Sequence, residues 1–178
     1  MTAPATDIGA IEGGRDMDLR NDFKLGMRRL VSGVSIVATA DEHGPKGFLA
    51  TSVSSVALDP TPCLLVCVNK SVSSHDAFIR TQVFSINVLA EQQVDVARRF
   101  SSSELRDARF EDDAWQVLET GAPIYRGALA SFDCRLMTTM TVQTHTLLIG
   151  CAVAVRTAES AVEPLIYYDG RFDRDRAA

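Results

Sequence analysis

The sequence has few cysteines, few histidines and no long apolar run, and each shortage excludes a class of protein. Its 178 residues include four cysteines, with no C-x-x-C pair, and three scattered histidines. A structural zinc site needs closely spaced Cys or His ligands, which this pattern lacks. No stretch approaches the roughly 18 consecutive apolar residues of a membrane-spanning helix. The sequence therefore predicts neither a metal centre nor a membrane segment.

Positive charge is also in short supply. The chain has 18 lysines and arginines against 23 aspartates and glutamates, a formal net charge of −5. A nucleic-acid-binding domain usually carries a basic stripe, so nucleic acid is not an expected partner. Residues 1–17 lack the basic start and apolar centre of a signal peptide, and we expect a disordered N-terminal arm there. With four cysteines in apolar surroundings, we expect packing thiols and a cytoplasmic protein.

Several catalytic motifs are missing as well. The sequence has no G-x-G-x-x-G after a strand, no phosphate-binding G-x-x-x-x-G-K-[ST] and no G-x-S-x-G nucleophile elbow. If the protein is an enzyme, we expect its redox or group-transfer chemistry to come from a bound cofactor and not from a catalytic triad.

The composition that remains is ordinary for a globular domain, with 46% hydrophobic and 23% charged residues. No internal repeat or linker divides the chain, so we expect one domain over residues 18–174 and a short tail over residues 175–178. Helices are predicted over residues 18–31, 71–80 and 91–100, and a charged loop or lid over residues 101–113. Apolar alternation predicts about seven strands, over residues 34–40, 48–58, 63–68, 83–89, 128–141, 146–155 and 165–168.

This order of elements favours a mainly β fold, an antiparallel β-barrel with short peripheral helices. A doubly wound α/β fold is the alternative. Its parallel strands would need crossover helices, and the chain between the first three strands is too short to hold any.

One unusual segment is the hydroxyl-rich run within residues 49–55, in the middle of a predicted strand. Its small side chains would let backbone groups approach a flat ring, and its hydroxyls could bond to ring heteroatoms. The simpler interpretation is a strand with one solvent-facing side. The candidate ligand-binding residues are Leu49, Ala50, Thr51, Ser52, Ser54 and Ser55.

A second unusual segment joins a buried strand to the start of a helix. Residues 68–76 read V-N-K-S-V-S-S-H-D, so serines and one lysine lie where unpaired backbone N–H groups could hold a phosphate. The simpler interpretation is a serine N-cap. The candidate ligand-binding residues are Asn69, Lys70, Ser71 and Ser74.

The two segments belong to a longer ordered pattern. G-F-L-A-T-S at residues 47–52 is followed by D-P-x-P at 59–62, L-V-C-V-N-K-S at 65–71 and F-S-I-N-V-L at 84–89. Residues 121–134, 145–150 and 164–168 continue it. This pattern resembles the short-chain flavin reductases, the reductase components of two-component flavin-dependent monooxygenases, which have an FMN-binding split-barrel fold.

The resemblance implies a homodimeric NAD(P)H:flavin oxidoreductase. It would pass a hydride from NADH or NADPH to FMN or FAD and supply reduced flavin to a partner monooxygenase. It further implies that residues 49–55 line the isoalloxazine ring and that residues 69–74 hold the phosphate and ribitol. The other implied residues are Asn87 in the same wall, Arg99 and Phe100 over the flavin, Tyr168 and Arg171 near the dinucleotide, and His145 beside the flavin ring and nicotinamide.

Two departures from the family pattern bear on this implied site. Many relatives have threonine where this chain has Leu49, and many have a glycine-containing pair where it has Gln143-Thr144. Two further interpretations stay open. The protein could bind flavin without turnover, or it could use bound flavin to reduce another acceptor, such as a corrinoid or a metal complex.

Overall fold

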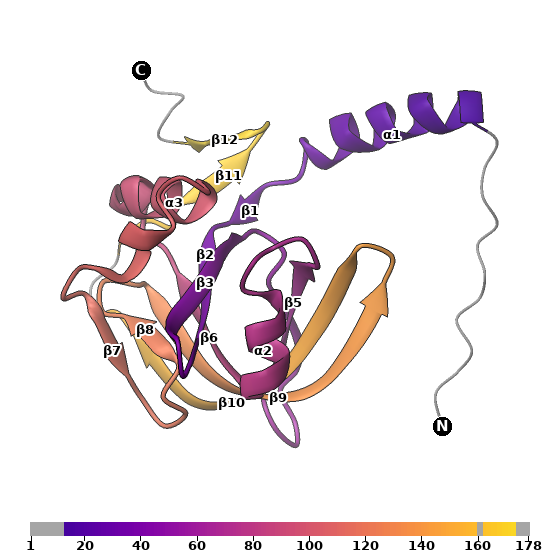
Figure 1. Cartoon of the computed structure of the whole chain (residues 1–178). Helices are drawn as coiled ribbons and strands as arrows, with labels where there is room; N and C mark the ends of the chain where they lie inside the picture. The colour runs from indigo at the N-terminus through magenta and orange to yellow at the C-terminus, as the bar shows by residue number, and fades with distance from the viewer. Residues whose placement is uncertain (1–12, 160–161, 174–178) are drawn as a thin grey trace.

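The computed structural model describes residues 13–159 and 162–173, and β-strands dominate them (Figure 1). A seven-stranded antiparallel sheet has the order β3-β2-β6-β9-β10-β5-β4. The mainly β prediction is confirmed, and the parallel alternative is wrong because every strand pair in this sheet is antiparallel. The strands are β2 (Ser35–Asp41), β3 (Gly44–Ala50), β4 (Ser54–Ala57), β5 (Cys63–Asn69), β6 (Val83–Val88), β9 (Ala130–Val142) and β10 (His145–Thr157).

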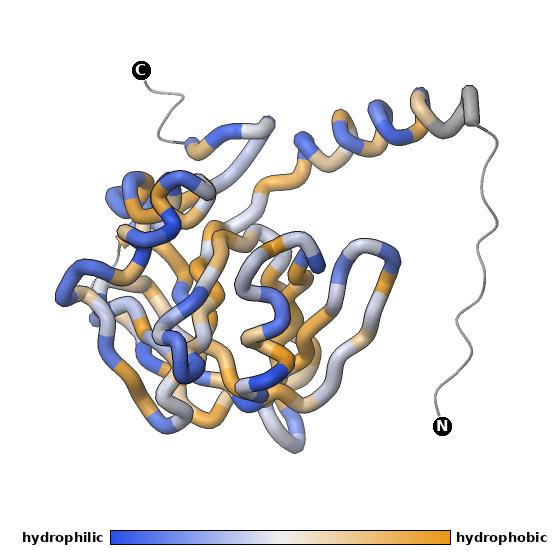
Figure 2. The backbone as a smooth tube through the Cα atoms, viewed as in Figure 1, coloured by the Kyte–Doolittle hydropathy of each residue, from blue (hydrophilic) through white to orange (hydrophobic). Residues whose placement is uncertain are grey.

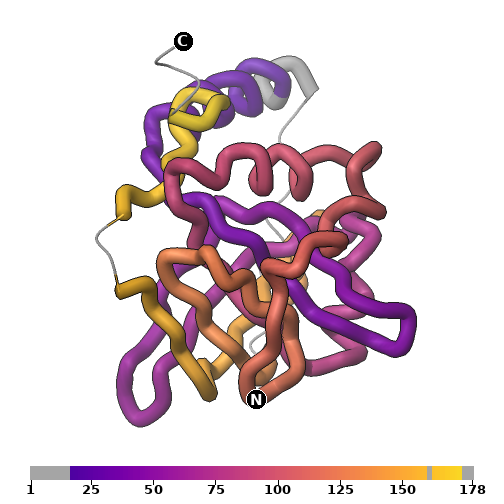
Figure 3. Tube along the Cα trace, turned by 90° about the vertical axis from the view of Figure 1, so that its left-hand side faces the viewer, coloured from indigo at the N-terminus to yellow at the C-terminus, as the bar shows by residue number. Residues whose placement is uncertain are grey.

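Smaller elements surround this sheet. A three-stranded sheet combines β1 (Ser32–Gly33), β11 (Ile166–Tyr168) and β12 (Arg171–Phe172), and a two-stranded sheet combines β7 (Trp115–Val117) and β8 (Pro123–Tyr125). The helical segments are α1 (Gly13–Met27), α2 (His75–Thr81), η1 (Glu91–Gln93), α3 (Val94–Ser101) and η2 (Asp107–Phe110). In both Figure 1 and Figure 3, α1 and the β11–β12 hairpin lie at the same end of the molecule. None of the helices within the described residues is long and apolar enough to span a membrane.

The two edge strands of the large sheet are neighbours in the sequence. β3 ends at Ala50 and β4 begins at Ser54, so residues 51–53 alone link one edge of the sheet to the other. Four Cα–Cα steps span at most about 15 Å, so the sheet must curl to bring its edges together. Among the described residues, no ladder pairs β3 with β4, and the sheet is therefore curled but not closed by strand pairing.

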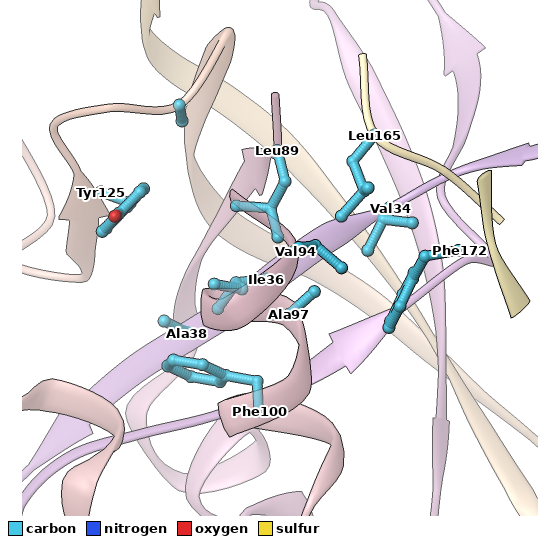
Figure 4. Packing of buried hydrophobic residues seen from close by; sticks show 11 residues of the cluster. Val34, Ile36, Ala38, Leu89, Val94, Ala97, Phe100, Tyr125, Leu165 and Phe172 are labelled. Atoms are coloured by element: carbon cyan, nitrogen blue, oxygen red, sulfur yellow. The ribbon is translucent and has the colours of Figure 1, made fainter. Parts of the chain in front are cut away.

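Two apolar clusters fill the interior. In the first, Val94, Ala97 and Phe100 of α3 pack over Ile36 and Ala38 of β2 (Figure 4). The second lies between β3, β5, β6 and α2, where Phe48 and Phe78 meet edge to face with ring centroids 5.5 Å apart. Along the strands, apolar and polar segments alternate in Figure 2. α3 and α2 thus cover opposite parts of the curled sheet and position the turns that precede and follow them.

One glycine is required by close packing. A Cβ atom on Gly150 of β10 would lie 2.5 Å from Cζ of Phe84, a ring with 0% exposure, and 3.2 Å from the Arg135 carbonyl oxygen. β10 carries a register shift at this point, between Ile149 and Gly150. Only glycine lets β10 pass over the Phe84 ring without displacing it.

Several predicted boundaries differ from the structure. The first helix covers Gly13–Met27 and not residues 18–31. The strand predicted over residues 48–58 is two strands with a break at 51–53, and the helix predicted over residues 71–80 begins at His75. The arm predicted over residues 1–17 lies mostly outside the described residues, as does the tail predicted over residues 175–178.

Candidate functional site

The break between β3 and β4 lies at the centre of the candidate site. Residues 51–53 belong to no strand, and the side chain of Thr51 is exposed. The Ser52 hydroxyl is committed to the fold, since it accepts a hydrogen bond from the Cys67 N–H at 3.2 Å and donates to the Cys67 carbonyl at 3.4 Å. Ser54 and Ser55 are exposed on β4. The hydroxyl-rich run therefore presents backbone, Thr51 and β4 hydroxyls to a ligand, while Ser52 anchors the break to β5.

A cavity of about 410 Å³ opens beside this break, and we call it the serine cavity. Residues from three separate segments surround it, which places the start of the hydroxyl-rich run opposite the turn before α2 and the end of α3. It is lined by Phe48, Leu49, Ser71, Val72, Ser73, Phe100, Ser101, Ser103, Arg106 and Arg109. The structure thus brings together Leu49, Ser71 and Phe100, all three of which are sequence-predicted site residues.

The turn between β5 and α2 is held in shape by its own side chains. The Asn69 carboxamide oxygen accepts hydrogen bonds from the backbone N–H and the hydroxyl of Ser71, both at 2.9 Å. Lys70 points elsewhere, because its ammonium donates to the Gln143 carbonyl at 3.0 Å in the β9–β10 turn. Ser74 is 2% exposed, and its hydroxyl has no hydrogen-bond partner among the described residues. In this conformation Asn69 shapes the turn and Lys70 ties it to the neighbouring hairpin.

Two arginines that the sequence analysis did not single out line the serine cavity. Arg109 is 9% exposed, and its guanidinium donates to the carbonyls of Gly47 at 2.9 Å and Ser102 at 2.8 Å. Burial, with a smaller contribution from the nearby charge of Arg106, lowers the pKa of Arg109 from its ordinary value. Both residues lie in the charge-dense stretch interpreted as a loop or lid. That stretch contains η2, and the ring of its residue Phe110 packs against the ring of Phe100.

Arg99, which the resemblance places over the flavin, is bound to other parts of the chain in this structure. Its guanidinium forms an ion pair with Asp112 at 3.0 Å and donates to the Ala108 carbonyl at 3.3 Å, and it does not line the serine cavity. Arg99 therefore fastens α3 to the segment after it, while the neighbouring Phe100 reaches the cavity. The arginines that line the cavity are Arg106 and Arg109.

Asn87, which the resemblance implies in the wall of the site, is buried inside the sheet. Its side chain is 0% exposed, and its carboxamide oxygen accepts hydrogen bonds from the Tyr125 N–H at 2.8 Å and the Ser131 hydroxyl at 2.9 Å. Its amide nitrogen donates to the Ser85 hydroxyl at 3.0 Å. With its carboxamide used inside the sheet, Asn87 cannot contact a ligand in this structure. It satisfies buried polar groups between β6, β8 and β9.

His145 begins β10 and pairs in register with Asn69 of β5. It is half-buried, and its Nδ1 lies 2.9 Å from the Thr144 hydroxyl. This register places the imidazole at the end of β5 where the serine-rich turn begins, although His145 does not itself line the serine cavity. A second histidine, His75, bonds through Nε2 to the Thr146 hydroxyl at 2.9 Å and connects α2 to β10.

A second cavity, of about 460 Å³, has Thr51 in its lining, and we call it the terminal cavity. It is formed by α1 together with the hairpin of β11 and β12. Its lining is Phe23, Lys24, Met27, Arg28, Leu30, Ser32, Thr51, Tyr167, Asp169 and Gly170. The predicted Tyr168 and Arg171 belong to this hairpin, but its neighbours Tyr167 and Asp169 are the residues that face the cavity.

The cysteines are free thiols packed within the sheet, and they do not form a set of metal ligands among the described residues. Cys63 and Cys151 are paired in register across β5 and β10, and their Sγ atoms lie 3.2 Å apart. The pKa of Cys63 is raised mainly by its hydrogen bond to the Cys151 thiol and, to a smaller extent, by burial. Burial is the main reason that the pKa of Cys134 is raised to about 12. Such thiols stay protonated and are poor nucleophiles. Within the described ranges, no group of three Cys, His, Asp or Glu side chains could hold a metal ion.

Comparison with known proteins agrees with this geometry. Residues 27–174 match the flavin reductase like domain. The chain belongs to this flavin reductase family. The resemblance found in the sequence is thereby confirmed, over a span that includes the serine cavity and the β11–β12 side of the terminal cavity.

Individual members of the flavin reductase family align over most of the chain. FMN reductase (NADH) RutF from Pantoea ananatis is 36% identical over 171 residues, which cover 96% of this chain and 88% of the relative. BorF, the flavin reductase component of a bacterial two-component tryptophan halogenase, is 31% identical with a TM-score of 0.77, covering 88% of this chain and 96% of BorF. NADH:FAD oxidoreductase SgcE6 from Streptomyces globisporus C-1027 is 28% identical with a TM-score of 0.80, covering 93% and 96%.

Proposed function

We propose that this protein is an NAD(P)H:flavin oxidoreductase that uses NADH or NADPH to reduce FMN or FAD and supplies the reduced flavin to a partner monooxygenase. The observation that carries the proposal is the position of residues 49–53. Leu49 lines the serine cavity and Thr51 lines the terminal cavity, so both cavities reach the same short segment. Two ligands held in them would approach each other at this exposed backbone, where their rings could make the direct contact that hydride transfer requires.

The residues present fit a flavin. Flavin, when bound, supplies the ring atom that accepts the hydride. Ser73 would donate a hydroxyl hydrogen bond to its phosphate, and Arg106 would add positive charge at the rim of the serine cavity. The N–H groups of residues 51–53 lie outside the strand ladders and can stabilise negative charge on the ring. Phe100 and Leu49 exclude water from the apolar part of the cavity.

The terminal cavity fits the nicotinamide dinucleotide. Lys24 of α1 and Arg28, directly after α1, supply two cations for its phosphates, and the Tyr167 ring provides a flat apolar surface for a base or nicotinamide. Asp169 lies on the same wall, where a phosphate added to the adenosine ribose would meet a negative charge. This supports NADH over NADPH as the donor. His145, at the β5–β10 edge, would position the nicotinamide from the other side of the turn.

A homodimer is part of the proposal. α1 stands away from the curled sheet in Figure 1, and its apolar side chains are exposed, with Phe23 at 65% and Met17 at 69%. Met137 and Met140 on the β9–β10 hairpin are 66% and 59% exposed. Exposed apolar surface of this extent is typical of a subunit interface. A second copy would cover α1, and a mass of about twice 19.3 kDa by light scattering is expected, whereas a monomer would contradict it.

We also propose that the curled sheet is a split barrel, with its open seam between β3 and β4, and that the protein acts in the cytoplasm. The seam is supported by the two edge strands, which are joined directly by residues 51–53 and are not paired with each other. The cytoplasmic site is supported by the four free thiols, which an oxidising compartment would not preserve. The reductase role of BorF in a two-component halogenase supports a partner oxygenase of the same general kind.

NADH oxidation by the purified chain, with and without added riboflavin, FMN or FAD, tests the function. A rate that rises with free flavin is expected. Bound flavin that NADH and NADPH cannot reduce would contradict the proposal and leave a binding protein. Tightly bound flavin with slow turnover of free flavin would also contradict it and would indicate another acceptor.

A further inference from the structure

We propose that Cys63 and Cys151 form a redox modification site, at which hydrogen peroxide converts two neighbouring thiols into a reversible disulfide. The residues lie at the start of β5 and in the middle of β10, and they are 88 positions apart in the sequence. Both thiols are free, and their Sγ atoms lie 3.2 Å apart. The pair does not depend on the flavin site, although an internal source of peroxide rests on the proposed function.

The backbone places the two thiols where a disulfide can form. Cys63 and Cys151 face each other in the antiparallel ladder of β5 and β10. The Ala152 N–H donates to the Pro62 carbonyl at 2.9 Å, and bonded and non-bonded pairs alternate along such a ladder. The cysteines are therefore a non-hydrogen-bonded pair, in which the Cα atoms are typically about 4.5 Å apart. This separation lies within the range of about 4.4–6.8 Å that disulfides span.

The thiol pair lies outside the apolar interior. Neither residue belongs to the two apolar clusters of the described residues, whereas the buried Cys134 belongs to the second. Cys151 is half-buried, and Arg135, which faces it from β9, is exposed. The side chains of directly paired residues lie on the same face of a sheet, so the Cys151 thiol shares a face with an exposed arginine. A small oxidant can therefore reach Cys151 from the solvent side.

The ladder is weak beside the pair, which gives the backbone room to adjust. Pro62 has no N–H, so its pair with Ala152 makes one hydrogen bond instead of two. The β9–β10 register shifts between Ala152 and Ala154, and the β4–β5 register shifts between Ser55 and Ala57. Local opening is easiest where hydrogen bonds are few. The sulfur atoms need to approach by only about 1.2 Å to reach the bonded distance of about 2.0 Å.

The reaction balances with hydrogen peroxide as the oxidant. The Cys151 thiolate attacks one peroxide oxygen and the O–O bond breaks, which gives a sulfenic acid at Cys151 and hydroxide. Cys63 keeps its proton until the second step, because its pKa is raised. Its thiol then attacks the sulfenic sulfur, the S–S bond forms, and the hydroxyl leaves with the Cys63 proton as water. Together, two thiols lose two electrons and one peroxide becomes two waters.

The proposed function would supply this oxidant. Reduced flavin that meets no partner enzyme passes two electrons to dioxygen, which gives oxidised flavin and hydrogen peroxide. A chain that releases reduced flavin is therefore exposed to peroxide whenever its partner is absent or saturated. The disulfide would then form during turnover that is not coupled to an oxygenase.

Thiol mapping of the full chain in its native assembly, after treatment with hydrogen peroxide, tests the site. Remaining thiols are alkylated under denaturing conditions, and mass spectrometry of the unreduced digest identifies linked peptides. We expect a disulfide between Cys63 and Cys151 within one chain, formed at least about tenfold faster than any oxidation of Cys67 and fully reversed by dithiothreitol. Cys67 is the internal control, because it is half-buried in the same strand but faces Leu147 and not a thiol.

Two variants separate the pair from general thiol reactivity. Cys63→Ala removes the thiol that completes the disulfide, so peroxide should leave a sulfenic acid at Cys151 that dimedone traps. Cys67→Ala is the matched control, and it should form the same disulfide as the unmodified chain. Thermal unfolding verifies that both variants fold.

Three results with added peroxide would overturn the inference: no disulfide in the unmodified chain, equal oxidation of Cys67 and Cys151, or a disulfide that links two copies of the chain. The source of peroxide is tested by turnover of NADH and FMN in air, with and without catalase. We expect the disulfide only without catalase, and its absence from both samples would overturn reduced flavin as the source. Failure of the proposed function is separate, because added peroxide would still link the pair in a chain that shows no flavin-dependent NADH oxidation.

Discussion

Arg109 and Arg106 are matched in position but not in bonding, and this difference gives a sharp prediction. Both arginines line the serine cavity. The Arg109 guanidinium is buried and donates to the carbonyls of Gly47 and Ser102, while Arg106 is exposed and its guanidinium has no hydrogen bond to another described residue. Replacing each with methionine keeps an unbranched side chain and removes only the charged group. Stability should separate the two variants, and flavin binding should not.

The size of the stability difference follows from the two carbonyls. Arg109→Met leaves the buried Gly47 oxygen without its partner, which costs roughly 1–3 kcal/mol. The Ser102 oxygen is only partly buried, so water can replace part of that bond and the added cost is about 1 kcal/mol or less. The third bond, to the Arg99 carbonyl, is long at 3.4 Å and adds little. We therefore expect a total near 2–3 kcal/mol for Arg109→Met and under about 0.5 kcal/mol for Arg106→Met.

Urea unfolding measures these free energies, and flavin fluorescence measures the affinity of each variant. Arg106→Met should weaken FMN binding about fivefold, the effect of about 1 kcal/mol, without moving the urea midpoint. Equal losses of stability in the two variants would refute the structural role assigned to Arg109. An unchanged FMN affinity in Arg106→Met would refute its place in the flavin site.

Three further predictions follow from His145, Gly150 and Asp41. His145→Ala should raise the KM for NADH or lower the hydride-transfer rate, measured by stopped flow, with flavin affinity nearly intact. Gly150→Ala should lower the free energy of unfolding by about 1–3 kcal/mol, because its methyl group would overlap the buried Phe84 ring. The hydrogen bond from Lys46 is the main reason that the pKa of Asp41 is lowered to about 2, against an ordinary value of 3.8. The stability that the Asp41 carboxylate contributes should therefore be complete above about pH 5 and lost as the pH falls towards 2. The difference in the free energy of unfolding between wild type and Asp41→Asn should shrink over that range.

Each of these predictions has a control and a contrary outcome. Unchanged NADH kinetics would remove His145 from the site. Gly33→Ala, where a methyl group would meet nothing within 4 Å, is the control for Gly150→Ala, and similar unfolding curves for both would contradict the packing argument. Asp95→Asn is the control for Asp41, because Asp95 lies in an exposed pair with Arg98. A wild-type difference for Asp41→Asn that is constant down to about pH 2 would mean that the carboxylate keeps its ordinary pKa.

The sequence predicted the sheet well because strand alternation is a local property. The long hairpin turning at residues 142–145 and the strands at 63–69 and 83–88 needed only the apolar pattern. The break at residues 51–53 was missed, since the hydroxyl-rich run continues the same β-type composition across it. β7 and β8 were missed because three residues are too few to show a period.

The candidate site was harder to predict because burial and side-chain direction depend on the whole fold. Arg109 lies in a polar, charge-dense stretch, and nothing local reveals that its guanidinium reaches the Gly47 carbonyl, 62 residues earlier in the chain. The resemblance implies Asn87 in the wall of the site, and nothing local reveals that its side chain is fully buried. Lys70 lies in the turn predicted to bind a ligand, but its ammonium donates a hydrogen bond to the Gln143 carbonyl.

The seam between β3 and β4 has a consequence for the behaviour of the chain in concentrated solution. An unpaired strand edge is a template on which another chain can add a strand and begin to aggregate. Here the exposed edge strand β4 has only four residues, and Asp59-Pro60 follows soon after it, so a foreign strand would find few backbone groups to pair with. The two edges can therefore remain unpaired without inviting the edge-to-edge association that a longer strand would allow.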